Sequence, residues 1–403
     1  MSQWIGVFQG RVSIAAFLVS GKGLIAGFRQ PHSGNLIDDS GIFTLPPALL
    51  EQLEEEQAYW LAAAMDSRST GTWVYQQKIQ PSEEVRTHWQ HRTVFFQRWQ
   101  IHQAVRRFFL DSGFTEVDTP LIVPCPGMEP YLDSFAAGTG FLRTSPELHM
   151  KRLLAAGYQS VFQMGPCFRA GDQGSLHREE FHMLEWYRAF ADLDHLIRDV
   201  SNLLASLSPL ASEPEYFTQK PEISTCAALF QRYLGVVLSD GGDREPLRKA
   251  LQERGIGFAA EDDWDTLFFL LFLNFIEPHL GCDAPLIVTD YPASQAALAK
   301  LAPSRSGSLN TCYRFEVYMR GMEIANAFYE LTDPSQQRTR FREDQRKRAA
   351  LKKVVYPIDE AFMYGLASGL PPTAGIALGL DRLAMVLLGK GRLDQILPFP
   401  QQE

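Results

Sequence analysis

The stretch EEFHMLEWYRA (residues 179–189) has an alternation that predicts a β-strand with one chemically unusual face. Successive side chains of a strand point to opposite faces, so Phe181, Met183, Glu185 and Tyr187 share one face. An aromatic ring can stack on a nucleotide base, and a carboxylate beside a phenol can hold an ammonium group. The strand is therefore a candidate wall of a ligand site, although the face of a solvated hairpin would have the same pattern.

The segment before this strand, VFQMGPCFRAGDQGSLH (residues 161–177), predicts its hairpin partner. A strand ends near Arg169 and is followed by a polar loop rich in glycine. A hairpin with arginine on one arm and Phe181 and Glu185 on the other suits a nucleoside triphosphate, because a guanidinium pairs with phosphate. By itself this hairpin leaves the function open.

A second hairpin is expected in FEVYMRGMEIANAFYELTD (residues 315–333). A two-residue turn at 320–321 would place Tyr318 opposite Glu323, on the face that also carries Glu316. Two carboxylates on one face suit a divalent cation. Asn326 and Glu330 have the other parity and join this face only if a β-bulge lies near residues 324–325. The alternative is an amphipathic hairpin with solvated acids.

Two further stretches contain candidate site residues. AGIALGLDRLAMVLLG (residues 374–389) has glycines at 375 and 379 that allow close backbone approach, and then Arg382 at the start of an apolar helix. TSPELHMKRLLAAG (residues 144–157) predicts a turn and a helix that begins near Glu147. Each has an ordinary structural explanation, namely glycine packing in the first and a well-formed helix start in the second.

Composition narrows the class of protein. The 403 residues are 45% hydrophobic and 21% charged, which is typical of a globular protein, and the net charge of −9 argues against a generally basic nucleic-acid binder. Five cysteines without a C-x-x-C pair indicate reduced thiols. No signal peptide is evident, and the most apolar run (residues 266–276) is too short for a membrane span. We therefore expect a cytoplasmic protein without a membrane partner.

The chain is expected to have two parts. Residues 1–70 predict a small β-rich domain with a helix over 46–65, and residues 66–84 read as a polar linker. Residues 71–403 form the second domain, with a long helix from about residue 88 to Gly113 and an amphipathic helix over 192–207 capped by Asp192. Strands carry the motifs and helices lie between them, which favours an α+β fold with an antiparallel sheet.

In their order and spacing, these stretches resemble the catalytic domain of class II aminoacyl-tRNA synthetases over about residues 90–395. GFTEVDTP resembles motif 1, CFRAGDQGSLHREEFHMLEWYRA motif 2 and GIALGLDRL motif 3. Within the class the chain is most similar to the lysyl branch, and above all to the elongation factor P–(R)-β-lysine ligases, through TSPELHMKRLLAAG, YPASQAALA and GMEIANAFYELTD. The resemblance implies a six-stranded antiparallel sheet flanked by helices, a homodimer built by motif 1, and ATP with Mg²⁺ as cofactors.

The resemblance also implies roles for individual residues. The catalytic residues would be Arg169 and Arg382. The amino-acid substrate would be bound by Ser145, Pro146, Glu147, Glu185, Tyr187, Asn326, Glu330 and Ala377. ATP would be bound by Arg169, Asp172, Arg178, Phe181, Glu323, Ile324, Gly379 and Arg382. Magnesium would be held by Glu316 and Glu323.

The motif 2 loop departs from the family pattern at two places. The usual Arg-x-Glu reads Arg169-Ala170-Gly171, so that Asp172 becomes the candidate for the adenine contact. The usual His-Asn-Pro-Glu begins His177-Arg178, so that an arginine stands at the nucleotide-contact position.

Three functions remain for such a chain. The first is ATP-dependent activation of (R)-β-lysine or lysine and its transfer to a lysine of elongation factor P, with tRNA not expected as acceptor. The second is a compact lysyl-tRNA synthetase. Residues 1–70 resemble an OB-fold anticodon domain but look too short for a complete one, and Ala377 replaces the glycine usual in those enzymes. The third is a lysine-sensing paralogue without catalysis, which loss of Arg169, Glu316, Glu323 or Arg382 would have favoured.

Overall fold

The computed structural model describes residues 22–29, 35–38, 41–44, 58–65, 71–79, 83–239, 243–303 and 309–399. They belong to two compact units, and the division falls after Gln97, inside a long helix. Residues 397–399 are grouped with the first unit. Each unit is described separately below.

The first unit contains a five-stranded antiparallel sheet in the order β3-β2-β1-β4-β5. Its strands are β1 (Lys22–Arg29), β2 (Asn35–Asp38), β3 (Gly41–Thr44), β4 (Ala58–Met65) and β5 (Gly71–Ile79). Five strands are the number in an OB-fold barrel. Four of these strands lie within residues 1–70, which we expected to be too short for a complete set, and the fifth, β5, lies beyond that boundary.

Two local predictions in the first unit are wrong. The end of the helix expected over 46–65 is strand β4, while residues 45–57 lie outside the described part. The linker expected over 66–84 contains β5, so the sheet continues past the boundary that we expected at residue 70. The alanines of AYWLAAAM favour a helix by propensity, but β4 pairs with β1 on one side and β5 on the other, and this pairing outweighs propensity.

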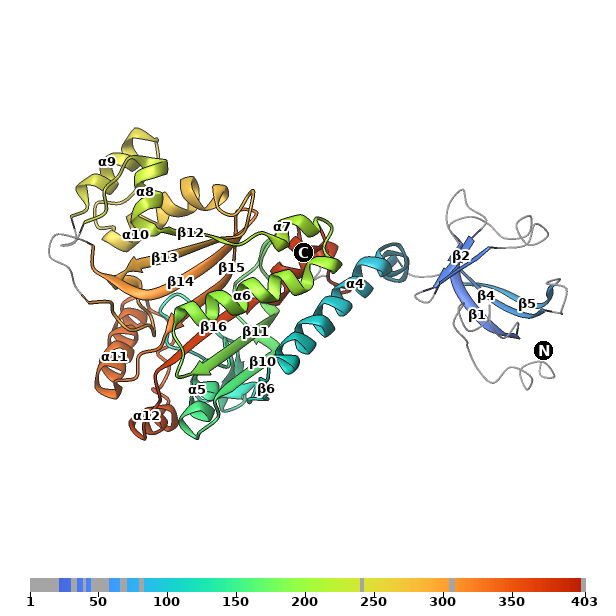
Figure 1. Ribbon diagram of the computed structural model, residues 1–403, viewed down its shortest axis with the longest axis horizontal. Coiled ribbons are helices and arrows are strands. Elements are labelled where there is room, and N and C mark those ends of the chain that lie inside the picture. The colour runs from blue at the N-terminus through green and yellow to red at the C-terminus, as the bar shows by residue number, and fades with distance from the viewer. Residues whose placement is uncertain are drawn as a thin grey trace. The chain divides into compact units, whose positions relative to one another are not determined.

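The second unit is built on an eight-stranded sheet in the order β12-β13-β14-β15-β16-β11-β10-β6 (Figure 1). The six central strands are antiparallel, as predicted: β13 (Leu286–Pro292), β14 (Thr311–Met319), β15 (Met322–Tyr329), β16 (Thr373–Gly379), β11 (Glu180–Ala189) and β10 (Ser160–Phe168). Two short edge strands add parallel pairs: β12 (Glu222–Thr225) beside β13, and β6 (Thr115–Glu116) beside β10.

The remaining elements surround this sheet. A small three-stranded sheet is formed by β7 (Ile122–Val123), β9 (Gly140–Leu142) and β8 (Ala136–Ala137). The α-helices are α4 (Glu83–Asp111), α5 (Glu147–Ala155), α6 (Leu193–Leu207), α7 (Pro214–Thr218), α8 (Cys226–Leu234), α9 (Glu245–Glu253), α10 (Trp264–Leu271), α11 (Pro334–Ala350), α12 (Glu360–Ala367) and α13 (Leu380–Leu387). The short helical turns are η1 (Ser208–Leu210), η2 (Phe272–Ile276), η3 (Glu277–His279), η4 (Ala293–Gln295) and η5 (Leu393–Gln395).

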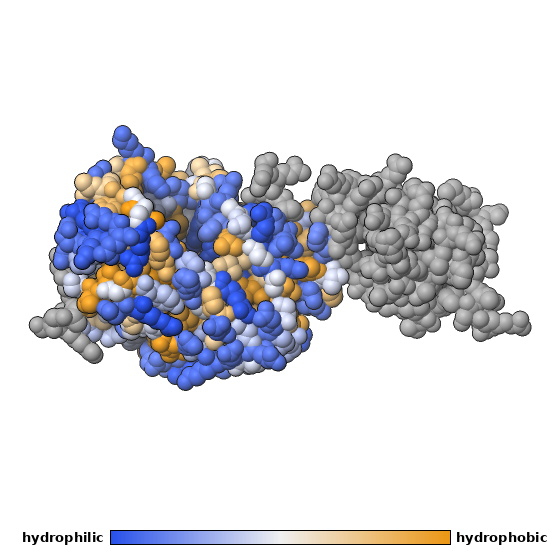
Figure 2. Space-filling view, turned by 90° about the horizontal axis from the view of Figure 1, so that it is seen from above, coloured by the Kyte–Doolittle hydropathy of each residue, from blue (hydrophilic) through white to orange (hydrophobic). Residues whose placement is uncertain are grey.

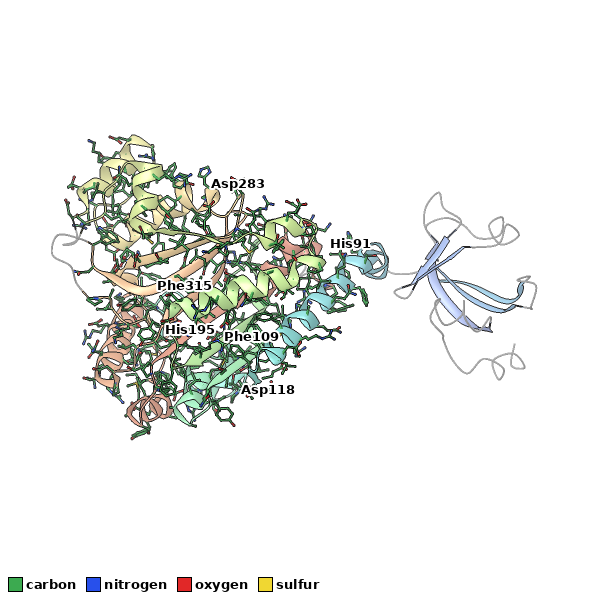
Figure 3. All side chains as sticks on the ribbon, viewed as in Figure 1. His91, Phe109, Asp118, His195, Asp283 and Phe315 are labelled. Atoms are coloured by element: carbon green, nitrogen blue, oxygen red, sulfur yellow. The ribbon has the colours of Figure 1, made fainter. Side chains whose placement is uncertain are left out.

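One face of the large sheet is covered by α6 and the second half of α4 (Figure 1). On α4 the ring of Phe109 lies 5.0 Å from the rings of Phe162 and Trp186, which are on the covered side of β10 and β11. The indole nitrogen of Trp186 donates to Asp199 of α6 at 3.2 Å. Figure 3 labels Phe109 here and also the fully buried Phe315 of β14. These contacts leave the opposite face of the sheet for the polar side chains.

Helices α8, α9 and α10 form a separate lobe with its own apolar core against β13 and β14. Figure 2 looks onto this side of the molecule and shows hydrophilic and hydrophobic residues interleaved over the described surface. No helix among the described residues is long and apolar enough to cross a membrane.

The β14–β15 hairpin has the predicted turn and bulge. Arg320 and Gly321 both have positive φ values, 52° and 74°, as a two-residue hairpin turn with the twist of the strands requires. Tyr318 pairs with Glu323, but Val317 pairs with residue 325, so one residue of β15 is extra at position 324. This bulge brings Glu316, Glu323 and Asn326 to one face and thereby assembles the wall of a cavity.

Candidate active site

A cavity of about 480 Å³ lies over the open face of the large sheet. Strands β11, β14, β15 and β16 form its floor, and residues from the 169–178 loop and from α10 to η3 form its sides. We call it the sheet cavity. Its walls include, from the residues predicted by sequence, Ser145, Glu147, Arg169, Asp172, Arg178, Phe181, Glu185, Tyr187, Glu316, Glu323, Ile324, Asn326, Glu330, Ala377, Gly379 and Arg382. Pro146 is the exception, because it is the buried N-cap residue of α5 and does not line the cavity.

One end of the sheet cavity is organised around Glu185, which is fully buried. Tyr187 donates its hydroxyl to Oε2 of Glu185 at 2.8 Å, and Ser145 donates to Oε1 at 2.6 Å. Burial raises the pKa of Glu185 to about 7, and the neighbouring carboxylate of Glu147 contributes to the rise. This carboxyl group is therefore held in place without being paired to a cation of its own.

Lys151 of α5 completes this end of the cavity, and sequence reasoning assigned it no role. Its Nζ atom lies 2.5 Å from a carboxylate oxygen of Glu147 and 2.5 Å from one of Glu330, and all three side chains are largely buried. Burial by itself would lower the pKa of Lys151, but the two carboxylates outweigh it and raise the pKa. Three carboxyl groups thus face one ammonium group, which leaves room for a second cation.

Gly375 has a structural role in addition to the one that its motif suggested. A Cβ atom at this position would lie 2.1 Å from the ring of Tyr187 and 2.7 Å from Oε1 of Glu330. Glycine is therefore needed at this position so that the side chains of Tyr187 and Glu330 can lie over β16. Gly375 also lines the sheet cavity, and its close approach to a ligand stays a prediction. Ala377, two residues along, is paired in register with Glu185 and Asn326 on the two neighbouring strands.

The other end of the cavity is formed by arginines and an aromatic ring. The guanidinium carbon of Arg169 lies 5.0 Å from the centre of the Phe181 ring, and the Nε atom of Arg169 has no hydrogen-bond partner among the described residues. Arg382 donates to the backbone carbonyls of Leu176 and Glu323 at 3.3 and 2.8 Å, and it also contacts the ring of His177. This arrangement leaves the guanidinium group of Arg169 available to an anionic ligand, while these three contacts hold Arg382 at the wall of the cavity.

The atypical motif 2 loop is held closed by Glu179. Its Oε1 atom accepts from the backbone N–H of Gly171 at 2.7 Å, its Oε2 atom accepts from Gln173 at 3.0 Å, and its carbonyl accepts from the N–H of Arg169 at 2.8 Å. Arg178 donates to the carbonyls of Gly174 and His177. Both Asp172 and Arg178 still line the cavity, and their nucleotide contacts stay predictions.

A separate group of carboxylates, which includes Glu316 and Glu323, lies where magnesium was expected. Glu316 accepts from the hydroxyls of Tyr291 and Tyr318, each at 2.5 Å, and pairs with Arg314. Burial and the charge of Glu316 raise the pKa of Glu323, while burial and the charge of Glu323 raise the pKa of Glu277 to about 7. Glu277 also lines the cavity and was not anticipated from the sequence.

These carboxylates fit a magnesium ion that is bound together with substrate phosphates. No group of three or more histidine, cysteine or acidic side chains in the described ranges could hold a metal ion by itself. Magnesium usually binds through one or two carboxylates plus phosphate oxygens, so Glu316 and Glu323 are a sufficient protein contribution. Their mutual repulsion would be relieved by a divalent cation.

The raised pKa of Glu185 predicts a pH-dependent affinity for a cationic substrate. The carboxyl ionises as the pH rises through about 7, so the Michaelis constant for a lysine substrate should fall between about pH 6 and about pH 8, where a lysine ammonium stays charged. Steady-state pyrophosphate exchange at several pH values measures this, and Glu185→Gln should reduce the change across this range. Burial also raises the pKa of Glu330 to about 8, so part of the change at the alkaline end should remain. A parent profile as flat as that of the variant would contradict the role of Glu185.

Comparison with known proteins places the second unit in a family. Residues 85–403 match the family described as tRNA synthetases class II (D, K and N). Proteins named elongation factor P–(R)-β-lysine ligase from Proteus mirabilis and Photorhabdus laumondii are each 41% identical over 315 residues, which covers 75% of this chain and 93% of theirs. The protein of the same name from Hamiltonella defensa is 38% identical over 311 residues, 74% of this chain and 92% of its own. The predicted fold class is confirmed, and the chain belongs to the class II tRNA synthetases of the D, K and N type, the family that includes these ligases.

Proposed function

We propose that this protein is an AMP-forming ligase that activates (R)-β-lysine or lysine with ATP and transfers the aminoacyl group to a lysine side chain of elongation factor P. The sheet cavity supports this proposal with a carboxylate-rich end and an arginine-rich end within one space. The names of the relatives support the choice of substrate and acceptor.

The observation that carries the proposal is the charge balance around Lys151. Glu147, Glu185 and Glu330 are placed around one internal ammonium group, so the pocket attracts another cation. A second ammonium on the substrate would be held by Glu185 and Glu330, with Tyr187 beside them. An amino acid with an amino-terminated side chain matches this arrangement better than an acidic or apolar one.

The arginine-rich end is suited to ATP. Arg169 would bind the α-phosphate and the substrate carboxylate, two anions that must meet for an adenylate to form. Phe181 and Arg382 would hold the two sides of the adenine ring, because guanidinium groups and aromatic rings both stack on a base. Magnesium held by Glu316 and Glu323 would neutralise phosphate charge when bound.

A lysyl-tRNA synthetase is the second candidate, and the five-stranded sheet of the first unit favours it. The family match begins at residue 85, after β5, so this sheet is additional to the matched domain. OB folds bind oligonucleotides on their strands, and the described residues before α4 hold five strands once β5, beyond residue 70, is included. The ligase remains our first choice because of Ala377 and the relatives' names.

Side-by-side acceptor assays test the proposal. Incubation of the full chain with ATP, magnesium and labelled (R)-β-lysine should label elongation factor P and leave lysine tRNA unlabelled. The same assay with α-lysine reports the preferred isomer. Efficient charging of tRNA, lost when residues 1–82 are deleted, would establish the tRNA synthetase instead. The deletion ends at residue 82 because β5 reaches Ile79.

We also propose that the protein is a homodimer formed through the motif 1 region. Trp99 and Leu110 on α4 and Leu121 and Ile122 at β7 expose 42–58% of their surface. A second copy covering this face would remove them from water. Sedimentation of the full chain measures the oligomeric state.

A further inference from the structure

A second, larger cavity of about 780 Å³ adjoins the sheet cavity. Its walls come from residues 126–131, from α10 and η2, from residues 293–298 and from α11, and we call it the outer cavity. Both cavities are lined by Glu129, Ser145, Glu147, Phe269, Ala297 and Arg314. The outer cavity therefore leads to the end of the sheet cavity where Glu147 and Arg314 lie.

The outer cavity is acidic. Six acidic side chains line it, namely Glu129, Glu147, Asp263, Asp265, Glu343 and Asp344, against three basic ones. Of the basic residues, Arg314 is paired with Glu316, and Arg340 donates to the carbonyls of Ala297 and Ala299. Gln295, which is 7% exposed, also lines this space and has an Oε1 atom without a hydrogen-bond partner in the described part of the chain. The lining thus provides hydrogen-bond acceptors and negative charge for a positively charged ligand.

Glu129 lies at the junction of the two cavities. Its Oε2 atom has no hydrogen-bond partner among the residues that the structure describes. Gly127 makes room for this carboxyl group, because a Cβ atom there would come within 2.6 Å of the Oε2 atom. Burial and the charge of Glu147 raise the pKa of Glu129, and Arg169 and Lys151 oppose the rise, so Glu129 is within electrostatic reach of the adenylation residues.

The loop that carries Glu129 is fixed from both sides. The fully buried Arg348 of α11 donates to the carbonyls of Glu129 at 2.9 Å and Leu132 at 2.7 Å, and its other nitrogen pairs with Asp133 at 2.6 Å. On the other side, the hydroxyl of Thr144 donates to the carbonyl of Pro126 at 2.6 Å. A side chain with a free carboxylate oxygen is thus held by a rigid support, an arrangement typical of a functional group.

We propose that the outer cavity admits the side chain of the acceptor lysine and that Glu129 removes a proton from its ammonium group. This inference rests on the proposed function and adds to it the entry path and the base for the second step. An extended lysine side chain is cationic in water, and the acidic walls with Gln295 would guide it inward. Glu129 would meet it beside Arg169, where the aminoacyl-adenylate is formed.

The step balances as follows. The acceptor ammonium gives one proton to the carboxylate of Glu129 and becomes a neutral amine. Its nitrogen forms a bond to the acyl carbon of the adenylate, the bond from that carbon to the phosphate oxygen breaks, and AMP leaves with the electron pair. The second proton of the nitrogen goes to the departing phosphate. A base of this kind contributes about 10²–10⁴-fold to a rate.

Glu129→Gln tests the base separately from adenylation. We expect pyrophosphate exchange near the parent rate, whereas single-turnover transfer to elongation factor P at pH 7 should fall by about 10²-fold or more. The variant's transfer rate should then rise about tenfold per pH unit toward the lysine pKa of about 10.4, because only the neutral amine reacts. Hydroxylamine, which is already neutral at pH 7, should take the aminoacyl group equally well from variant and parent.

Two further variants serve as control and as a test of the entry path. Glu261→Gln removes an exposed charge that lines neither cavity and should transfer like the parent. Ser294→Trp narrows the outer cavity at a position that does not line the sheet cavity, so it should block protein labelling but not hydroxylamine capture. Parent-like transfer by Glu129→Gln, or by Ser294→Trp, would overturn the inference while leaving the ligase proposal intact. A parent that labels no elongation factor P would instead refute the proposed function.

Discussion

Arg169→Ala is expected to lower lysine-dependent pyrophosphate exchange by about 10²–10³-fold, the usual effect of removing one contact that stabilises developing charge. Arg169 lines the sheet cavity near Phe181, and its Nε atom lacks a hydrogen-bond partner among the described residues. Its charge is thus available for the carboxylate and the α-phosphate, which repel each other as they approach. The measurement is exchange of labelled pyrophosphate into ATP at saturating magnesium.

The control for this variant is Arg346→Ala, which removes the same charge from an exposed position on α11. It should leave exchange unchanged, and both variants should melt near the parent temperature. Near-parent exchange by Arg169→Ala would remove Arg169 from the mechanism. A large fall in melting temperature would instead show that Arg169 supports the fold of the hairpin.

Glu330→Gln is expected to weaken use of the amino acid strongly and use of ATP little. The change keeps the size of the side chain but removes one of the carboxylates around Lys151, so the pocket loses its excess of negative charge. Truncating one partner of a buried, hydrogen-bonded charge pair in a binding site costs about 2–5 kcal/mol of binding free energy. Since 1.4 kcal/mol is a factor of ten, kcat/KM for lysine should fall by about 30-fold or more. The Michaelis constant for ATP should change little, because Glu330 belongs to the opposite end of the cavity.

A loss of activity in Glu330→Gln could also arise because Lys151 loses its partner. Melting temperatures of the variant with and without lysine distinguish the two explanations. If Glu330 serves only to hold Lys151, the Gln variant will lose thermal stability, but lysine will protect it as well as it protects the parent. If Glu330 also binds the substrate ammonium, this ligand-induced rise in melting temperature will be lost. Unchanged protection by lysine together with unchanged kcat/KM would show that the substrate is bound elsewhere.

Much of the sheet cavity was readable from the sequence because strand alternation is a local property. The pattern in 181–187 assigned Phe181, Glu185 and Tyr187 to one face, and the structure places all three on the wall of the cavity. The turn at Arg320–Gly321 was predicted from the sequence. Counting parity along the hairpin showed that Asn326 needed a bulge to join the face of Glu316, and the structure has that bulge at residue 324. The helix over 192–207 was predicted for the same reason, since its leucines recur at helical spacing.

In the first unit, secondary structure predicted from short segments of sequence was wrong. The alanine-rich run 58–65 favours a helix when considered alone, and residues 71–79 look like a polar linker. Both become strands because each finds a partner, β4 between β1 and β5, and β5 beside β4. Backbone pairing between segments far apart in the chain cannot be seen in a window of sequence.

The sequence by itself determined the family-specific motifs and the six antiparallel strands, and all but one of the site residues predicted from it line the sheet cavity. Only the tertiary structure decided how those side chains are charged and partnered. Lys151 meets Glu330 across 179 residues of chain, and the loop of Glu129 is held by Arg348 of α11. Charge balance in a buried pocket depends on which groups are brought together and how far water is excluded, and neither quantity is encoded in the spacing of residues along a strand.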